Sequence, residues 1–141
     1  MRRLWRRFFT LRPRERALLG QAALTLALTR VGLWLIPLGN LRRLLEPSSR
    51  SAGNATAGEI AWAIAAAARR LPWMTCLVEA LTAQRLLRQA GLSCELRIGM
   101  RRAAGNRPIE AHAWVVSDGQ VVAGRDSMLS AYVVLSPSGS G

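Results

Sequence analysis

The stretch PWMTCLVEALTAQRLLRQAG, residues 72–91, decides the fold that we expect. Pro72 breaks the preceding segment, and apolar residues then recur at helical spacing from Cys76 onward. Gly91 follows the last apolar position and is a typical helix end. Cys76 is therefore predicted to lie in the first turn of a helix that begins near Thr75.

After Gly91 the helical period gives way to alternation, which predicts strands. The expected strands cover residues 94–100, 110–116, 120–123 and 131–135. The Asp118-Gly119 pair between two of them is typical of a two-residue hairpin turn. The tail, residues 136–141, is rich in Ser, Gly and Pro, and we expect it to be flexible.

Upstream of Pro72 the pattern predicts helices over residues 13–36, 38–46 and 57–71. Thr56 is a suitable N-cap, and Glu59 stands three residues later, as a capping box requires. Helices come first in the chain and a small antiparallel sheet follows, so the expected fold class is α+β.

Charge divides the chain unevenly. It has 141 residues, a mass of 15.4 kDa and a net charge of +12, and every one of its 20 basic residues is arginine. Residues 1–50 hold 11 arginines against two acids, a balance of +9, whereas residues 51–141 hold nine against six. This asymmetry argues against a ribosomal or histone-like protein that is basic throughout. We expect a basic, apolar docking segment (1–50), a catalytic core (51–135) and the tail (136–141).

The segment 17–36 is apolar over 20 residues, carries only Arg30 as a charge and follows an arginine cluster. It therefore resembles a signal anchor that could span a bilayer. A narrow polar stripe nevertheless runs along it at spacings of three and four residues: Gln21, Thr25, Thr29 and Gly32. We favour a buried or interfacial helix, with membrane insertion as the alternative.

Cys76 and the single histidine, His112, are the residues most suited to chemistry. Unpaired N–H groups in the first turn of a helix favour a thiolate and can bind an oxyanion. A cysteine at a helix start and a histidine on a strand form the arrangement that a nucleophile and its base require. The alternatives are that Cys76 is a small core residue and that His112 is structural.

A third group should orient the imidazole, and Asp118 and Asp126 are the candidates. Asp118 is explained by the tight turn. A regular hairpin places residue 112 opposite residue 125, next to Asp126, so we prefer Asp126. Trp114 lies on the strand face of His112 and is expected to shield it.

The two cysteines and one histidine lack the spacing of a zinc site, so no metal is expected. A disulfide between Cys76 and Cys94 is possible by count alone. No other feature suggests a disulfide-rich secreted protein, so we interpret both thiols as reduced and Cys94 as structural.

The Cys76-led helix, the Ala111-His-Ala-Trp114 strand and the Asp118-Gly119 turn resemble the transglutaminase-like cysteine peptidases of lasso-peptide biosynthesis, the B2 or leader-peptidase proteins. The resemblance covers roughly residues 10–135. It implies a papain/transglutaminase-like core with a Cys–His–Asp triad, in which Cys76 is the nucleophile and His112 the base. Many relatives carry the acid about where Gly124 stands here, so Asp126, two residues on, departs from the pattern.

The resemblance also implies a function and partners. Such peptidases cleave the leader from a ribosomally made precursor peptide, and a separate ATP-dependent cyclase then closes the core. The chain is too short for a fused leader-recognition domain, so we expect a separate leader-binding protein and no cofactor. The expected location is the cytoplasm, with membrane association through residues 17–36 as a further possibility. The alternative is a non-catalytic basic adaptor that binds nucleic acid or anionic membrane through its N-terminus. Nothing organised for base reading follows the arginines, so nucleic acid is not expected.

Overall fold

The computed structural model describes residues 10–47, 54–71, 74–102, 105, 108–126 and 129–139. Within these ranges the helices are α2 (Pro13–Leu35), α3 (Leu38–Leu45), α4 (Ala57–Ala68) and α5 (Cys76–Gln89), with a short 3-10 helix, η1 (Leu129–Ala131). The strands are β1 (Glu95–Arg101), β2 (Glu110–Ser117), β3 (Gln120–Ala123) and β4 (Val133–Gly139). The expected α+β class and its helix-then-sheet order are confirmed.

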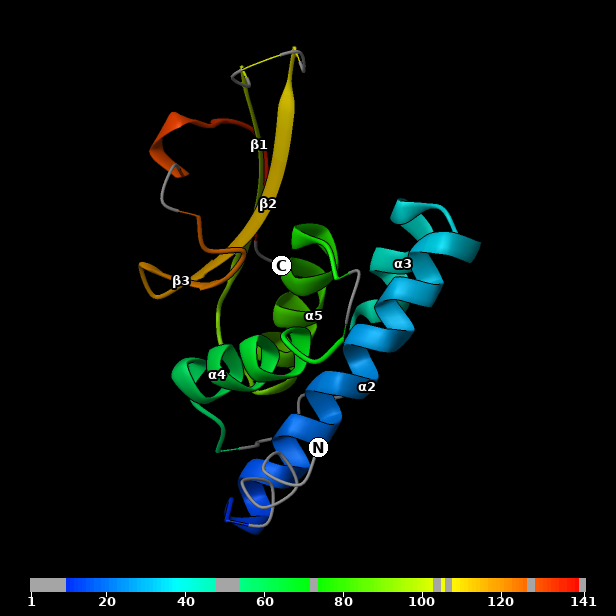
Figure 1. The fold of residues 1–141 in the computed structure, drawn as a ribbon, viewed down its shortest axis with the longest axis vertical. Helices are drawn as coiled ribbons and strands as arrows, with labels where there is room; N and C mark the ends of the chain where they lie inside the picture. Colours follow the sequence, from blue (N-terminus) through cyan, green and yellow to red (C-terminus); the bar gives the residue numbers. More distant parts are fainter. Residues whose placement is uncertain are drawn as a thin grey trace.

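The four strands form one antiparallel sheet in the order β3-β2-β1-β4. Figure 1 shows the helices gathered below and to the right of this sheet, with the β1–β2 hairpin extending past them. Helix α5 contacts the sheet, mostly through β2, and also contacts α2 and α4. It is therefore the element that joins the helical part of the molecule to the sheet.

Local sequence signals set the helix boundaries. The Thr56 hydroxyl accepts a hydrogen bond from the Glu59 amide, and the Glu59 carboxylate accepts one from the Thr56 amide, which completes the predicted capping box. Gly91 adopts a φ of 77° directly after α5, a left-handed conformation that glycine tolerates best. The predicted start of α4 and end of α5 are thus confirmed.

Helix α2 is long and apolar enough to cross a membrane by length and composition. One of its faces nevertheless lies in the core: Leu19, Ala22, Thr25, Leu26, Thr29 and Gly32 are buried. The Thr82 hydroxyl of α5 lies 3.5 Å from that of Thr29, so these buried polar groups are partners. Three of the four residues in the predicted polar stripe thus belong to this packed face.

The β2–β3 hairpin differs from the regular pairing that we predicted. Ser117 pairs with Gln120 as expected, but a bulge between Val115 and Val116 then shifts the register by one residue. Strand β3 ends at Ala123, so the predicted pairing of residue 112 with residue 125 does not form. The bulge is not visible in the sequence, because both strands keep a simple apolar pattern around it.

The C-terminal segment also differs from the prediction. We expected a flexible tail from Ser136, but β4 runs on to Gly139 and pairs with β1. Strand β4 lies at the edge of the sheet, where Pro137 can be accommodated although it has no N–H to donate. The Ser, Gly and Pro content therefore led to the wrong prediction of a flexible tail at a segment that forms an edge strand. Ser140 and Gly141 lie outside the described residues.

A matched pair of substitutions tests whether α2 is a core helix. Leu26 is fully buried, whereas Leu28, two residues on, is exposed. We expect Leu26→Ala to lower the free energy of unfolding by about 2–5 kcal/mol, because it leaves a cavity. Leu28→Ala should change it by less than about 0.5 kcal/mol. Urea unfolding measures both values, and equal effects would contradict this placement of α2.

Candidate functional site

Cys76 is the first residue of α5, as the sequence predicted. Thr75 is the N-cap, and its hydroxyl accepts a hydrogen bond from the Val78 amide at 3.4 Å. Cys76 is half-buried, and its thiol is not in a disulfide. The first N–H groups of an α-helix have no partner within the helix and can donate to an anion bound at its N-terminus.

Cys94 has a different environment. Its Sγ–H donates to the carbonyl oxygen of Gln84 at 3.8 Å. Burial raises the pKa of the Cys94 thiol, and the nearby Arg88 opposes this rise in part. A thiol that stays protonated is a poor nucleophile. The structure therefore agrees with the interpretation of Cys94 as a structural residue.

His112 lies in β2, and its Nε2 is 2.6 Å from the carbonyl oxygen of Gly124. A carbonyl oxygen can only accept, so Nε2 carries the proton and donates it. In the neutral ring the other nitrogen, Nδ1, then holds the lone pair. Gly124 therefore fixes both the orientation of the imidazole and the nitrogen that can act as a base.

Gly124 is held in a conformation that few other residues adopt. Its φ is 74°, and a Cβ added there would collide with the carbonyl oxygen of Ala113 and lie 2.9 Å from Cα of Trp114. A side chain at this position would displace the carbonyl that holds His112. The resemblance pointed to this place for the acid, and here the backbone of Gly124 supplies the hydrogen-bond acceptor.

Two aromatic rings flank the imidazole. The ring centroid of His112 lies 6.0 Å from that of Trp114 and 5.4 Å from that of Tyr132. Gly99, opposite His112 in β1, leaves room for them, because a Cβ there would come within 2.8 Å of the Tyr132 Cβ. Trp114 thus takes up the position that we predicted, whereas Tyr132 was not singled out by the sequence analysis.

The aromatic group is separate from the main core. Ala113 and Val115, which alternate with His112 and Trp114 along β2, belong to the core between the sheet and the helices. Because side chains alternate along a strand, His112 and Trp114 lie on the other face of β2. The imidazole is therefore held by the aromatic rings and by Gly124, outside the helix–sheet core.

Asp126 joins this group through Tyr132. The Tyr132 hydroxyl donates a hydrogen bond to Oδ2 of Asp126 at 3.2 Å. Asp118 occupies the exposed hairpin turn with a φ of 51°, as its explanation by turn geometry predicts. The structure thus brings together His112, Tyr132 and Asp126 and keeps Asp118 in a turn.

Glu79 links the first turn of α5 with the imidazole. It stands three residues after Cys76, so the two side chains are neighbours along one side of the helix. Burial raises the pKa of the Glu79 carboxyl, and the charge of His112 lowers it in part, so these groups are within electrostatic range. No hydrogen bond joins Cys76 to His112 among the described residues. The spacing from Cys76 was the signal that could have identified Glu79.

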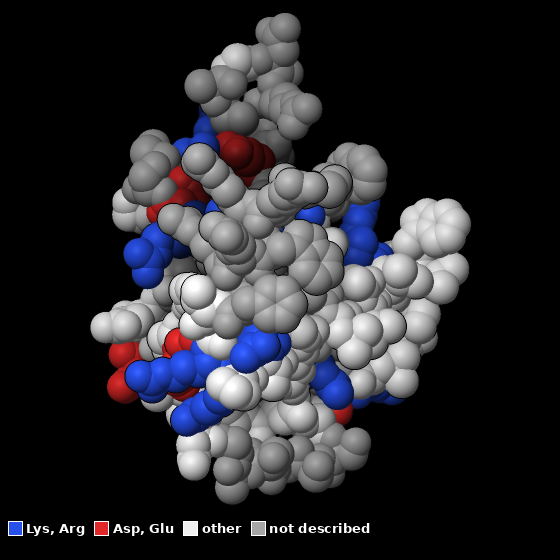
Figure 2. Space-filling model, turned by 60° about the horizontal axis from the view of Figure 1, so that its bottom comes forward, with Lys and Arg blue, Asp and Glu red and all other residues white. Residues whose placement is uncertain are grey.

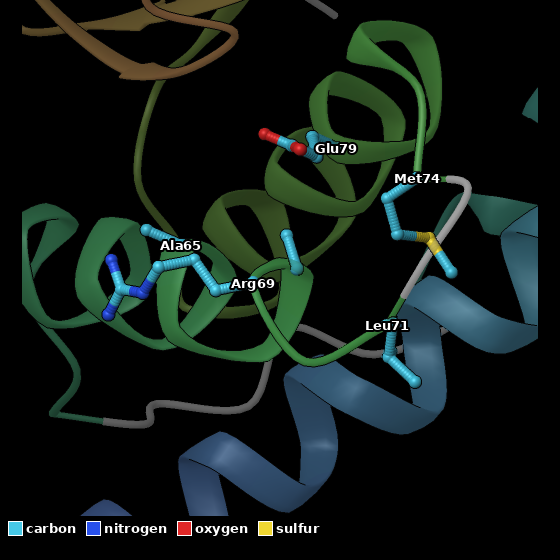
Figure 3. A pocket seen from close by; sticks show the side chains of 6 residues that line it. Ala65, Arg69, Leu71, Met74 and Glu79 are labelled. Carbon is cyan, nitrogen blue, oxygen red and sulfur yellow. The ribbon is translucent and has the colours of Figure 1, made fainter.

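A cavity of about 430 Å³ adjoins this turn, between the end of α4 and the start of α5. Figure 3 shows Glu79 on one side, Arg69 on another, and Leu71 and Met74 along the connection. The full lining is Ala65, Ala68, Arg69, Leu71, Met74 and Glu79. Within the described ranges, no three of His, Cys, Asp or Glu are close enough to hold a metal ion. Its apolar residues and its two charged side chains, Arg69 and Glu79, suit this cavity to part of a peptide.

Gly124 offers a direct test of how the imidazole is held. In Gly124→Ala the left-handed conformation alone should cost more than about 1 kcal/mol in the free energy of unfolding, and the collision with Ala113 should add to it. Urea unfolding measures the loss. Gly58→Ala is the control, because a Cβ there meets only open space and the Thr56 hydroxyl. A loss no larger than that of the control would contradict the described geometry.

Glu79 predicts a pH-dependent effect. Because burial raises the carboxyl pKa, the ionised group costs folding free energy above the pKa that it has in the unfolded chain. Glu79→Gln should therefore raise the free energy of unfolding more at pH 7 than at about pH 3, where both states hold the proton. Urea unfolding at the two pH values checks this. An effect that is the same at both would show that Glu79 bears no ionisation cost.

The comparisons with known proteins agree with this fold. A family model described as the transglutaminase-like superfamily matches residues 18–137, which include both the helix of Cys76 and the strand of His112. No curated protein and no solved structure matches the chain. Members of the superfamily are typically cysteine peptidases or transferases. The chain belongs to the transglutaminase-like superfamily.

Proposed function

We propose that the protein is a cysteine peptidase that hydrolyses the leader–core amide bond of a ribosomally made lasso precursor peptide. One observation carries this proposal. Cys76 is the first residue of α5, and the chain belongs to a superfamily whose members are typically cysteine peptidases or transferases. Glu79, one turn further along α5, lies within electrostatic range of His112. The lasso-peptide part of the proposal rests on the sequence resemblance.

In this mechanism the Cys76 thiolate attacks the carbonyl carbon at the leader–core junction, and N–H groups of the first turn of α5 stabilise the oxyanion. Nδ1 of His112, which has taken the proton of the Cys76 thiol, gives that proton to the leaving amine of the core peptide, which departs as the C–N bond breaks. The imidazole then takes a proton from water as that water attacks the acyl-enzyme, which releases the leader acid and the free thiol. Nδ1 is the basic nitrogen, because Nε2–H is bonded to Gly124.

The thiol and the imidazole must meet for this chemistry. They are not hydrogen-bonded in the structure, and catalytic hydrogen bonds are often long before substrate binds. We propose that peptide binding in the cavity beside α5 turns the Cys76 side chain so that Sγ approaches Nδ1, while the backbone of α5 and the imidazole stay in place.

We propose Asp126 as the acid of the triad, acting on His112 through the Tyr132 ring against which the imidazole packs. A separate leader-binding protein would deliver the precursor, and an ATP-dependent cyclase would use the new amine of the core. The location that suits these partners is the cytoplasm.

Reconstituted cleavage tests the catalytic assignment. The full chain is incubated with candidate precursor peptides and a leader-binding protein, and mass spectrometry follows the products. Cleavage should occur at one bond, disappear in Cys76→Ala and fall by about 10²–10⁴-fold in His112→Ala. Cys94→Ala should cleave like the parent chain. Full cleavage by Cys76→Ala would refute a peptidase based on this cysteine.

The same assay separates the two aspartates. Asp126→Asn and Tyr132→Phe should each slow cleavage, and their combination should cost little more than either, because the two side chains act through one hydrogen bond. Asp118→Asn is the matched control in the exposed turn. Equal loss in Asp118→Asn and Asp126→Asn would contradict the assignment. Salt-sensitive DNA binding without any cleavage would favour the basic adaptor instead.

A further inference from the structure

Helix α2 exposes a row of large apolar side chains to solvent. Leu24, Leu28, Val31 and Leu35 follow one another at spacings of four, three and four residues, and Trp34 lies beside them. Their exposed fractions run from 53% to 85%, highest for Trp34. We call these five residues the α2 stripe. An exposed apolar row of this length on a folded domain is typical of a surface that binds a protein or a membrane.

The opposite face of α2 determines how the stripe can be used. Ala22, Leu26 and Thr29 are fully buried against the rest of the molecule, and Thr29 is partnered by Thr82. Withdrawing α2 into a bilayer as a span would expose this packed face and empty the core. The folded protein can therefore present α2 only from the side, with the stripe facing outward.

Arginines border the stripe. Arg30 is exposed on α2, and α3 carries Arg42 and Arg43 next to the exposed Leu44. None of the three arginines forms an ion pair among the described residues, and the nearby Glu46 is paired with Arg88 at 2.8 Å. Figure 2 shows the right side of the molecule, where α2 ends, as a largely uncharged surface with arginines at its edges.

We propose that the α2 stripe binds an anionic lipid surface, with α2 lying in the plane of the membrane and the domain outside it. The leucines and Val31 would enter the acyl boundary, Trp34 would sit at the headgroup level, and the three arginines would contact lipid phosphates. The net charge of +12 adds a long-range attraction to such a surface. This attachment does not depend on the peptidase activity.

The charges favour lipid over a second copy of the chain. A symmetric dimer through the α2 stripe would bring Arg30 and Arg43 of both copies toward one another without acidic partners. An anionic membrane supplies the missing negative charge along the whole length of the stripe. The free protein is therefore expected to be a monomer at micromolar concentration.

Vesicle flotation of the full chain tests the proposal. Binding to vesicles of phosphatidylglycerol and phosphatidylcholine should exceed binding to phosphatidylcholine alone by about 100-fold or more. Replacing Arg30, Arg42 and Arg43 by Gln should weaken binding about 100-fold, since each arginine near an anionic surface contributes about fivefold. Leu28→Gln with Trp34→Gln should weaken it about tenfold or more.

Matched controls come from the other side of the molecule. Ile109→Gln and Leu135→Gln alter exposed apolar residues of the sheet region, and Arg125→Gln removes an exposed charge. These variants should bind vesicles like the parent chain. Equal losses in the stripe and control variants, or no preference for anionic vesicles, would overturn the proposal. So would retention after alkaline carbonate washing, which indicates insertion, or a dimer that Leu28→Gln dissociates in sedimentation equilibrium.

Discussion

The burial of α5 is the constraint on which the rest of the structure depends. Eight of its fourteen residues are buried, and it is packed against two helices and the sheet. A helix enclosed in this way cannot slide or rotate without opening cavities in the core. The position of its first residue, Cys76, is therefore fixed, although that residue lies at the open end of the helix.

The imidazole is held by a different set of interactions. Its nearest partner is a backbone carbonyl at a glycine with positive φ, and its ring packs against two aromatic side chains. Gly124 brings the carbonyl close, and Gly99 gives the aromatic rings their space. Gly124 and Gly99 thus allow His112 to be held in one position, and core packing holds Cys76 in its position. Glu79 is the described group that connects the two sides electrostatically.

The sequence was informative where a local signal sets the structure. The cap at Thr56, the first turn that contains Cys76 and the Asp118-Gly119 turn each depend on a few neighbouring residues, and each was predicted. The bulge in the β2–β3 pairing, the extent of β4 and the place of Tyr132 depend on pairing between distant segments, which no local pattern encodes. The partner of Nε2 could not be predicted from side chains at all, because it is a backbone carbonyl.

The central claim is that Cys76 and His112 act as a pair, and alkylation of the folded chain tests it most directly. Iodoacetamide labelling at pH 6.5, read by peptide mass spectrometry, gives the rate at Cys76, with the half-buried Cys94, whose thiol pKa is raised, as an internal control. The account predicts that Cys76 reacts faster than Cys94 and that His112→Ala slows it about tenfold or more. Equal rates at Cys76 with and without His112 would contradict the account.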